Sequence, residues 1–344
     1  MFLRISIILT VLLLLGAGVY PVATNTRQYR IKELLAQLTS QDNNKQWYAF
    51  RALVGMKAKE AIPKFTLLLQ DNDPSIREWA VDALKELGAK EAIPQITKLL
   101  RDKEIRCDAV KALGRLGAKE AIPQITVLLQ DNDSYVRQSA LEALAQLNAK
   151  EAIAEITKLL QDNVPWVRHE AVEALGRLGA KETIPQISIL LQDNNSVVRS
   201  RAISALGKLG AKEAIPEIIK LLQDNDYMIF DSAAYALGEL GVKEAIPEIT
   251  RLLKDHYDCW SAVLSLGILD AKESIPELVR FLNYTSEDAR GITAMVLVEL
   301  GAKDKVPEKV IADIKLLLGW RDDISVRARA ALKELGAEIP EEKK

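Results

Sequence analysis

Apolar and polar positions follow one another along this chain with the period of a helix. Between residues 121 and 129, and again between 136 and 147, apolar residues are spaced by three and four positions. Such spacing places apolar side chains on one face of a helix. The segment 130–134 between the two runs is rich in Asp, Asn and Ser, which are typical of turns. The pattern predicts two amphipathic helices joined by a tight turn, and no strand.

This helix pair is repeated along the chain every 29 or 31 residues. Its clearest marker is the string Ala-Lys-Glu-Ala-Ile-Pro or a close variant of it. The repeats begin near residues 27, 58, 89, 118, 149, 180, 211, 242, 271 and 302. One helix pair cannot bury its apolar face alone, whereas stacked pairs share a continuous core. The sequence therefore predicts an all-α protein, an α-solenoid of about ten helix–turn–helix repeats over residues 24–340, with a polar tail at 341–344.

Glycines and prolines mark the ends of the predicted helices. Gly stands directly after the second helix in seven repeats, and Asn148 and Asp270 take this position in two others. These residue types tolerate the left-handed conformation that ends a helix, whereas Lys57 of the first repeat does not fit the pattern. Proline, as at Pro123, lies in the first turn of the first helices, where a missing N–H costs little. The glycines are therefore interpreted as helix stops, and no nucleotide-binding loop is predicted.

Charge and composition narrow the function further. The chain has 46 basic and 48 acidic residues, so it carries no excess of positive charge for nucleic acid. Its two histidines, His169 and His256, lie three repeats apart, and its two cysteines, Cys107 and Cys259, lie five repeats apart. Stacked helices are about 8–10 Å apart, too far for these residues to form a metal site or a disulfide. We predict a protein without cofactor or metal, and not an enzyme.

The amino-terminal segment 1–23 differs from the repeats. Arg4 and the amino group precede an apolar run from Ile5 to Val19, followed by small residues. This order is typical of a signal peptide, although no clean cleavage site is present. The 19 residues from Ile5 to Ala23 would also barely cross a bilayer as a helix. The sequence predicts a protein that is exported, or anchored to the membrane through this segment alone.

The spacing of proline, aspartate and arginine within each repeat carries a family resemblance. Asp131 lies eight residues after Pro123, and Arg137 follows six residues later. This frame resembles HEAT repeats, and strings such as Val136-Arg137 and 174–179 resemble the subclass named after phycobilisome lyases. The resemblance implies that the Asp and Arg side chains form a structural ladder between neighbouring repeats. The residues expected in this ladder are Asp71, Arg77, Asp102, Arg106, Asp131, Arg137, Asp162, Arg168, Asp193, Arg199 and Asp224.

The ladder is expected to break in the seventh and eighth repeats. Phe230 replaces the arginine of the seventh repeat, and the eighth is shortened around residues 256–260. A broken ladder indicates a bend or a specialised surface.

The second helices are expected to line the concave face of the solenoid, which is the usual binding surface of this architecture. Aromatic and variable residues near the starts of these helices are predicted to bind a protein partner, because Trp and Tyr are enriched at interface hot spots. They are Trp79, Tyr135, Trp166, His169, Arg201, Tyr227, Phe230, Tyr257 and Trp260. The alternative for each ring is packing across a repeat junction, and for His169 an exposed helix position.

Three functions remain open from the sequence. The first is a non-catalytic protein-binding scaffold that is exported or tethered to a membrane. The second, implied only by the family resemblance, is a phycobilin lyase or a lyase-partner subunit, although the signal-like segment argues against a cytoplasmic lyase. The third is a structural spacer of the cell envelope. The partner and the oligomeric state are left undetermined.

Overall fold

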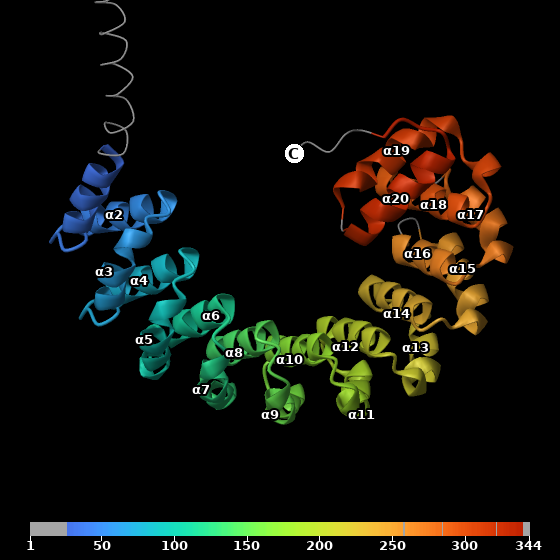
Figure 1. The fold of residues 1–344 in the computed structure, drawn as a ribbon. Helices are drawn as coiled ribbons and strands as arrows, with labels where there is room; N and C mark the ends of the chain where they lie inside the picture. Colours follow the sequence, from blue (N-terminus) through green and yellow to red (C-terminus); the bar gives the residue numbers. More distant parts are fainter. Residues whose placement is uncertain (1–25, 257–258, 284, 321, 340–344) are drawn as a thin grey trace, which may run out of the picture. The chain divides into compact units, whose positions relative to one another are not determined.

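The structure is a computed structural model that describes residues 26–256, 259–283, 285–320 and 322–339. The predicted signal or anchor segment, Tyr257 and the polar tail lie outside these residues. The described residues form helices joined by turns, with no strand among them, as predicted (Figure 1).

In most repeats the second helix is the longer one. These helices are α2 (Asn43–Gly55), α4 (Pro74–Glu86), α6 (Arg106–Leu116), α8 (Ser134–Gln146), α10 (Pro165–Leu178), α12 (Ser196–Leu209), α14 (Tyr227–Glu239), α16 (Trp260–Ile268), α18 (Glu287–Glu299) and α20 (Asp322–Glu334). An aspartate or asparagine often caps them. Asp133, for example, accepts a hydrogen bond from the Tyr135 N–H at 2.9 Å.

The first helices are short. They are the helix over 26–37, α3 (Ile62–Leu68), α5 (Ile93–Lys98), α7 (Ile122–Val127), α9 (Ile153–Lys158), α11 (Ile184–Ile189), α13 (Ile215–Leu221), α15 (Ile246–Asp255), α17 (Ile275–Phe281) and α19 (Ile311–Leu316). A tight 3₁₀ turn such as Lys119–Ala121 precedes most of them, and a second one such as Leu128–Gln130 often follows. The sequence pattern predicted one helix where the structure has a helix flanked by 3₁₀ turns.

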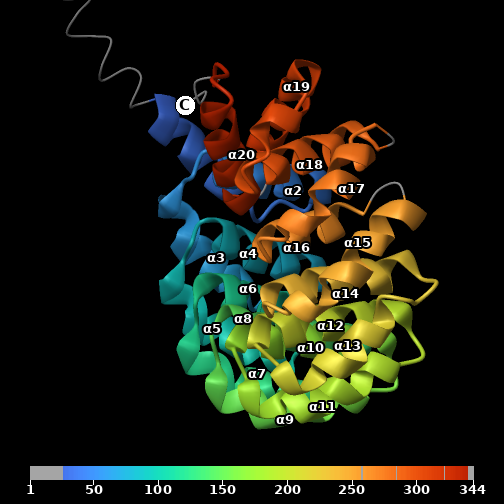
Figure 2. The same ribbon diagram turned by 90° about the vertical axis from the view of Figure 1, so that its right-hand side faces the viewer.

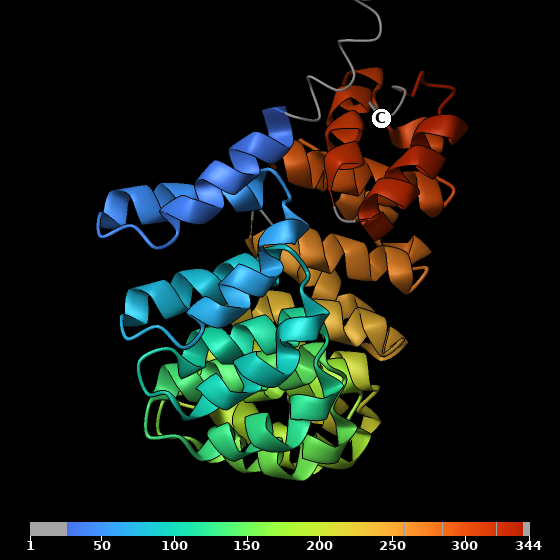
Figure 3. The ribbon, with the colours of Figure 1, turned by 60° about the vertical axis from the view of Figure 1, so that its left-hand side comes forward.

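The chain divides into two compact units, one up to Ala152 and the other from Ile153 onward. In the first unit, α2, α4, α6 and α8 form one row, and α3, α5 and α7 form a second row behind it (Figures 1 and 3). In the second unit, α10, α12 and α14 form one row, and α11 and α13 form a second row alongside it (Figures 1 and 2). Fully buried residues such as Leu113 and Leu206 fill the space between the two rows.

The helix stops lie where the sequence predicts them. Lys57, whose residue type does not fit the pattern, also ends its helix in the same way. Seven glycines with φ between 66° and 81° stand at the predicted positions, and Asn148 and Asp270 adopt φ values of 54° and 53°. Lys57 adopts the same left-handed conformation with φ 49°, so the first repeat ends as the others do despite its residue type.

Two glycines within the second helices, Gly207 and Gly238, have a different role, which the sequence interpretation missed. A Cβ atom at Gly207 would lie 3.0 Å from the Ala236 Cβ, and one at Gly238 would lie 2.8 Å from the Ser265 Cβ. The first distance is tighter than most real Cβ contacts and the second is essentially absent among them, so glycine at these positions permits neighbouring second helices to approach closely. The interpretation of the glycines as helix stops alone is therefore wrong for these positions.

Candidate functional site

Three cavities lie between consecutive second helices, on the face that these helices present away from the first helices. One of about 350 Å³ lies between α2 and α4, and another of about 210 Å³ lies along α4, α6 and α8. Both belong to the first unit. The third, of about 220 Å³, lies in the second unit between α12, α14 and α16. We call this face the second-helix face.

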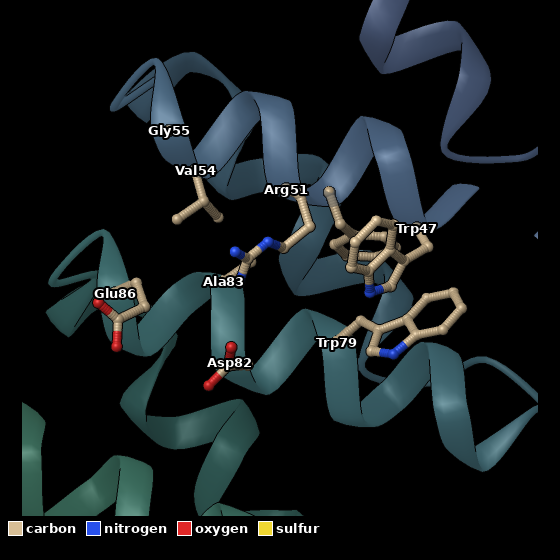
Figure 4. A pocket seen from close by; sticks show the side chains of 9 residues that line it. Trp47, Arg51, Val54, Gly55, Trp79, Asp82, Ala83 and Glu86 are labelled. Atoms are coloured by element: carbon tan, nitrogen blue, oxygen red, sulfur yellow. The ribbon is translucent and has the colours of Figure 1, made fainter. Parts of the chain in front are cut away.

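The cavity between α2 and α4 is lined by two tryptophans, Trp47 and Trp79 (Figure 4). Phe50 packs edge-on against Trp79 with ring centroids 5.8 Å apart, which fixes the position of that ring. The Arg51 guanidinium lies 5.8 Å from the centre of the Trp47 ring, a cation–π distance. Trp47 remains 49% exposed. Trp47 and Trp79 therefore offer an accessible aromatic surface, and packing against Phe50 holds the Trp79 ring in place.

The opposite wall of this cavity is acidic. Asp82 and Glu86 stand on α4, along the side of the cavity away from Trp47 (Figure 4). Asp82 also forms an ion pair with Lys85 of its own helix. An apolar side chain flanked by polar groups would fit between these walls, which is the composition typical of interface pockets.

The cavity along α4, α6 and α8 is more polar. Lys111 and Arg115 line it from α6, and Glu142 and Gln146 line it from α8. It has no aromatic lining residue. The two cavities of the first unit therefore differ in chemistry although the same helix positions form them.

The cavity of the second unit contains a partly buried carboxyl group, Asp231, whose Oδ1 atom is buried. Arg201 and Lys208 line the cavity from α12, and Trp260 and Ser261 line it from α16. The Ser261 hydroxyl donates to Asp231 Oδ2 at 2.8 Å. Burial raises the pKa of Asp231 to about 6, and the hydrogen bonds from Ser261 offset only part of this effect.

His169 and Arg201 are joined to Glu173 in a polar cluster between α10 and α12. Arg201 Nε donates to His169 Nε2 at 3.0 Å, and Arg201 Nη1 donates to Glu173 Oε2 at 2.9 Å. Burial and the positive charge of Arg201 lower the pKa of His169, and Glu173 offsets part of the shift. His169, expected to be an exposed helix residue, is instead half-buried and acts as a hydrogen-bond acceptor.

The predicted aromatic residues fall into different environments. Tyr135, Trp166 and Tyr227 are 65%, 48% and 45% exposed, at the first or second position of their helices, and they do not line the three cavities. Trp260 is half-buried, with its ring edge-on to Trp320 at 6.4 Å. Phe230, expected on the binding surface, is only 1% exposed. It is a core residue, because its ring packs against neighbouring rings.

The Asp and Arg positions link consecutive repeats. Arg168 donates from Nε and Nη2 to the two carboxylate oxygens of Asp193, each at 2.7 Å, and from Nη1 to the Asp162 carbonyl at 2.8 Å. Burial alone would raise the pKa of Asp193, but the hydrogen bonds from Arg168 and from the Asn195 N–H hold it below its ordinary value. The charges of Arg168 and Asp193 therefore pair with each other and link two repeats of the fold.

Related links occur in both units. Arg77 Nε lies 2.9 Å from Asp102 Oδ2, and Arg106 Nη2 donates to Asp131 Oδ1 at 2.9 Å. As Arg168 does, three further arginines donate from Nη1 to the carbonyl of the turn aspartate in their own repeat, namely Arg77 to Asp71, Arg137 to Asp131 and Arg199 to Asp193.

At the interruption predicted in the seventh repeat, a different contact replaces the ion pair. Phe230 stacks on His256 with ring centroids 4.2 Å apart and an angle of 29° between the rings. The link between the repeats is therefore kept, with aromatic stacking in place of charge. Further along, Arg290 Nε donates to Asp313 Oδ2 at 2.6 Å, so the ion-pair form returns.

The described part of the chain contains neither a metal-binding cluster nor a membrane-spanning helix. No group of three or more His, Cys, Asp or Glu side chains in it could hold a metal ion. Among the same residues, none of the helices combines the length and the apolar composition needed to cross a bilayer. Neither Cys107 nor Cys259 forms a disulfide within these residues.

The repeat pattern matches the family model for HEAT repeats over residues 31–105, 101–176, 125–196 and 185–260. The chain belongs to the HEAT-repeat family. No curated protein matches its sequence. HEAT-repeat membership establishes the architecture and leaves the partner of the second-helix face undefined.

Several solved structures are similar to this chain. YibA of Escherichia coli is 20% identical, with a TM-score of 0.55 over 72% of this chain and 96% of that chain. An engineered protein is 23% identical, with a TM-score of 0.46 over 90% and 99% of the two chains. The complex of CpcE and CpcF of phycocyanin lyase from Nostoc sp. PCC7120 is 22% identical, with a TM-score of 0.44 over 80% and 94%. Similarity at this level concerns the fold alone.

Proposed function

We propose that this HEAT-repeat protein is a non-catalytic scaffold that binds another protein along its second-helix face. The observation that carries the proposal is the cavity between α2 and α4, where Trp47 and Trp79 line one accessible hollow. Partly exposed tryptophans held by packed neighbours are the side chains most often found at interface hot spots. Stacked helical repeats commonly bind partners along such a face.

The proposal is tested by capture from a native cell extract with the full chain as bait. The test variant carries Trp47→Ala and Trp79→Ala. The matched control carries Val127→Ala and Ile189→Ala, which remove exposed apolar side chains of the first helices, 71% and 69% exposed. We expect one protein to be retained by the wild type and by the control, and its retention to fall at least about tenfold with the test variant. Circular dichroism checks that both variants fold.

A second variant asks whether contact extends to the second unit. Trp166→Ala with Tyr227→Ala removes exposed rings of α10 and α14. Loss of the same partner in this variant shows that exposed rings of the second unit also contribute to binding, and unchanged capture restricts the contact to the first unit. Equal capture by wild type and both test variants would overturn the assignment of this face as the binding surface.

The capture also separates the other two functions that the sequence leaves open. The motifs of residues 136–137 and 174–179 resemble repeats of the phycobilisome-lyase type, so retention of phycobiliprotein subunits would favour a lyase-related role. A structural spacer is favoured if no protein is retained in a saturable manner.

We further propose that the repeats act outside the cytoplasm, from the signal-like or anchor-like pattern of residues 1–23. Mass spectrometry of the mature amino terminus, combined with cell fractionation, tests this. An unprocessed chain in the soluble cytoplasmic fraction would contradict it.

A further inference from the structure

The cavity between α12, α14 and α16 has a chemistry that the proposed function does not use. We propose that it is a recognition site for the cationic side chain of a lysine or arginine, with Asp231 as the group that pairs with the cation. The inference rests on the proposed function in one respect, because the cation is assigned to the bound polypeptide.

One oxygen of the Asp231 carboxylate lacks a hydrogen-bond donor. Asp231 Oδ1 is buried and has no hydrogen-bond partner among the residues that the structure describes. The other oxygen, Oδ2, already accepts from the Ser261 hydroxyl at 2.8 Å. A buried carboxylate oxygen without a donor is costly, so its presence in a cavity favours a ligand that supplies one.

Two hydroxyl groups of the cavity have also used their protons. The Ser204 hydroxyl donates to the Ser200 carbonyl at 3.1 Å, and the Ser261 hydroxyl donates to Asp231. Each hydroxyl has one proton and two lone pairs, so these two groups can only accept from a ligand. Together with Asp231 Oδ1 they present acceptors to a ligand, which suits an ammonium or guanidinium group.

The charges of the lining favour a cation over an anion. Arg201 is neutralised by Glu173 at 2.9 Å, and its Nε is occupied by His169. Lys208 and Glu239 also line the cavity, one charge of each sign. The negative charge of Asp231 is therefore the one that the lining does not balance.

The Trp260 ring, at the rim formed by α16, adds an aromatic surface to the cavity. Aromatic faces attract cations within about 6 Å of the ring centre. The volume of about 220 Å³ accommodates the end of one long side chain and not a larger ligand. A single lysine or arginine of an extended polypeptide matches both the size and the polarity.

The experiment uses the full chain labelled with 5-fluorotryptophan, in which Trp260→Phe assigns the Trp260 signal. The probe is Nα-acetyl-lysine methylamide, and its neutral control is the same compound acetylated at Nε. We expect the cationic probe to shift the Trp260 ¹⁹F signal in a saturable manner and the neutral compound to leave it unchanged at equal ionic strength.

Two variants give opposite expected effects. Asp231→Asn keeps the shape and removes the charge, so it should weaken the cationic probe at least about tenfold. Lys208→Gln removes a like charge, so it should tighten binding about two- to threefold. Equal affinity of wild type and Asp231→Asn, or equal binding of the two probes, would overturn the site. A Lys208→Gln variant that weakens binding would contradict the location of the cation.

The outcome is separable from that of the scaffold proposal. If the captured partner is retained but the probe titration fails, the scaffold stands and the cation site is wrong. If the titration succeeds while no partner is captured, the cavity binds cations but the proposed function is wrong.

Discussion

At the scale of single residues, Asp231 differs most from its surroundings. It carries an acidic group at a position where the adjacent repeats have Ser200 and Trp260, and burial raises its pKa to about 6. A residue that lowers stability and faces a cavity is typical of a site kept for binding.

Because burial of the Asp231 carboxylate lowers the free energy of unfolding, this free energy should depend on pH. Its pKa is raised from 3.8 when unfolded to about 6 when folded, so the folded state favours the protonated form. The associated stability is present below pH 4 and is lost as the pH rises through 6, by up to about 3 kcal/mol. We expect Asp231→Asn to be more stable than the wild type by about 1–3 kcal/mol at pH 7.5, and by much less at pH 4.5.

Urea unfolding of both proteins across this pH range measures the difference. A constant difference between the variant and the wild type at every pH would contradict the prediction. A variant less stable than the wild type at pH 7.5 would show that Asp231 contributes to the folded state through its charge.

At the scale of helices, the glycines of the second helices determine how closely neighbouring repeats approach. The same helix position is occupied by Gly176, Gly207 and Gly238, but the space beside it differs. A Cβ atom at Gly176 would have its nearest neighbour, the Ala205 Cβ, at 3.5 Å, an ordinary contact. At Gly238 it would meet the Ser265 Cβ at 2.8 Å and the Ser265 Cα at 2.9 Å.

This difference predicts opposite effects for one substitution. Gly238→Ala should lower the free energy of unfolding by about 1–3 kcal/mol, because α14 and α16 must separate to admit the methyl group. Gly176→Ala should be neutral or stabilising by up to about 1 kcal/mol, because alanine favours the helix and the space admits it. Thermal unfolding of the two variants provides the comparison, and stabilisation by both would refute the packing role of Gly238.

The replacement of one ladder link by stacked rings also belongs to this scale. Phe230 and His256 connect their repeats without a carboxylate, so this junction does not depend on an Asp–Arg pair. The sequence predicted an interruption here because it compared residue types at one position. The residue that stacks on Phe230 is His256, which is not one of the turn aspartates in that comparison.

At the scale of the whole molecule, the repeats make each part of the chain depend mainly on its neighbours. Stability in such arrays is approximately a sum over repeats and the contacts between adjacent ones. The division into two compact units at residues 152 and 153 agrees with this local organisation.

A core substitution in the first unit tests the local organisation. Phe65 is fully buried and stacks on Phe50 with ring centroids 5.1 Å apart. Phe65→Ala should lower local stability by about 3–5 kcal/mol. Amide hydrogen exchange should accelerate in α2–α5 and remain unchanged in α12–α16. Equal acceleration throughout would indicate a single cooperative unit and contradict the nearest-neighbour description.

The candidate site was only partly accessible from the sequence. Trp79 is among the residues predicted to bind and lies in the largest of the three cavities, but its companion Trp47 is not among them. Trp47, Asp231 and Trp260 all stand directly after the ladder position of their repeats. Aligning the repeats on that position would have identified all three.

The sequence by itself determined the helical repeat, the left-handed helix stops and the positions of the turn aspartates and ladder arginines. These features depend on residues close to one another along the chain, and each is repeated several times. Only the tertiary structure decided that Phe230 is buried, that Gly238 adjoins Ser265 and that Asp231 faces a cavity. Those outcomes depend on how side chains from adjacent repeats meet, since the distance between two second helices and the residues across the junction set both burial and charge.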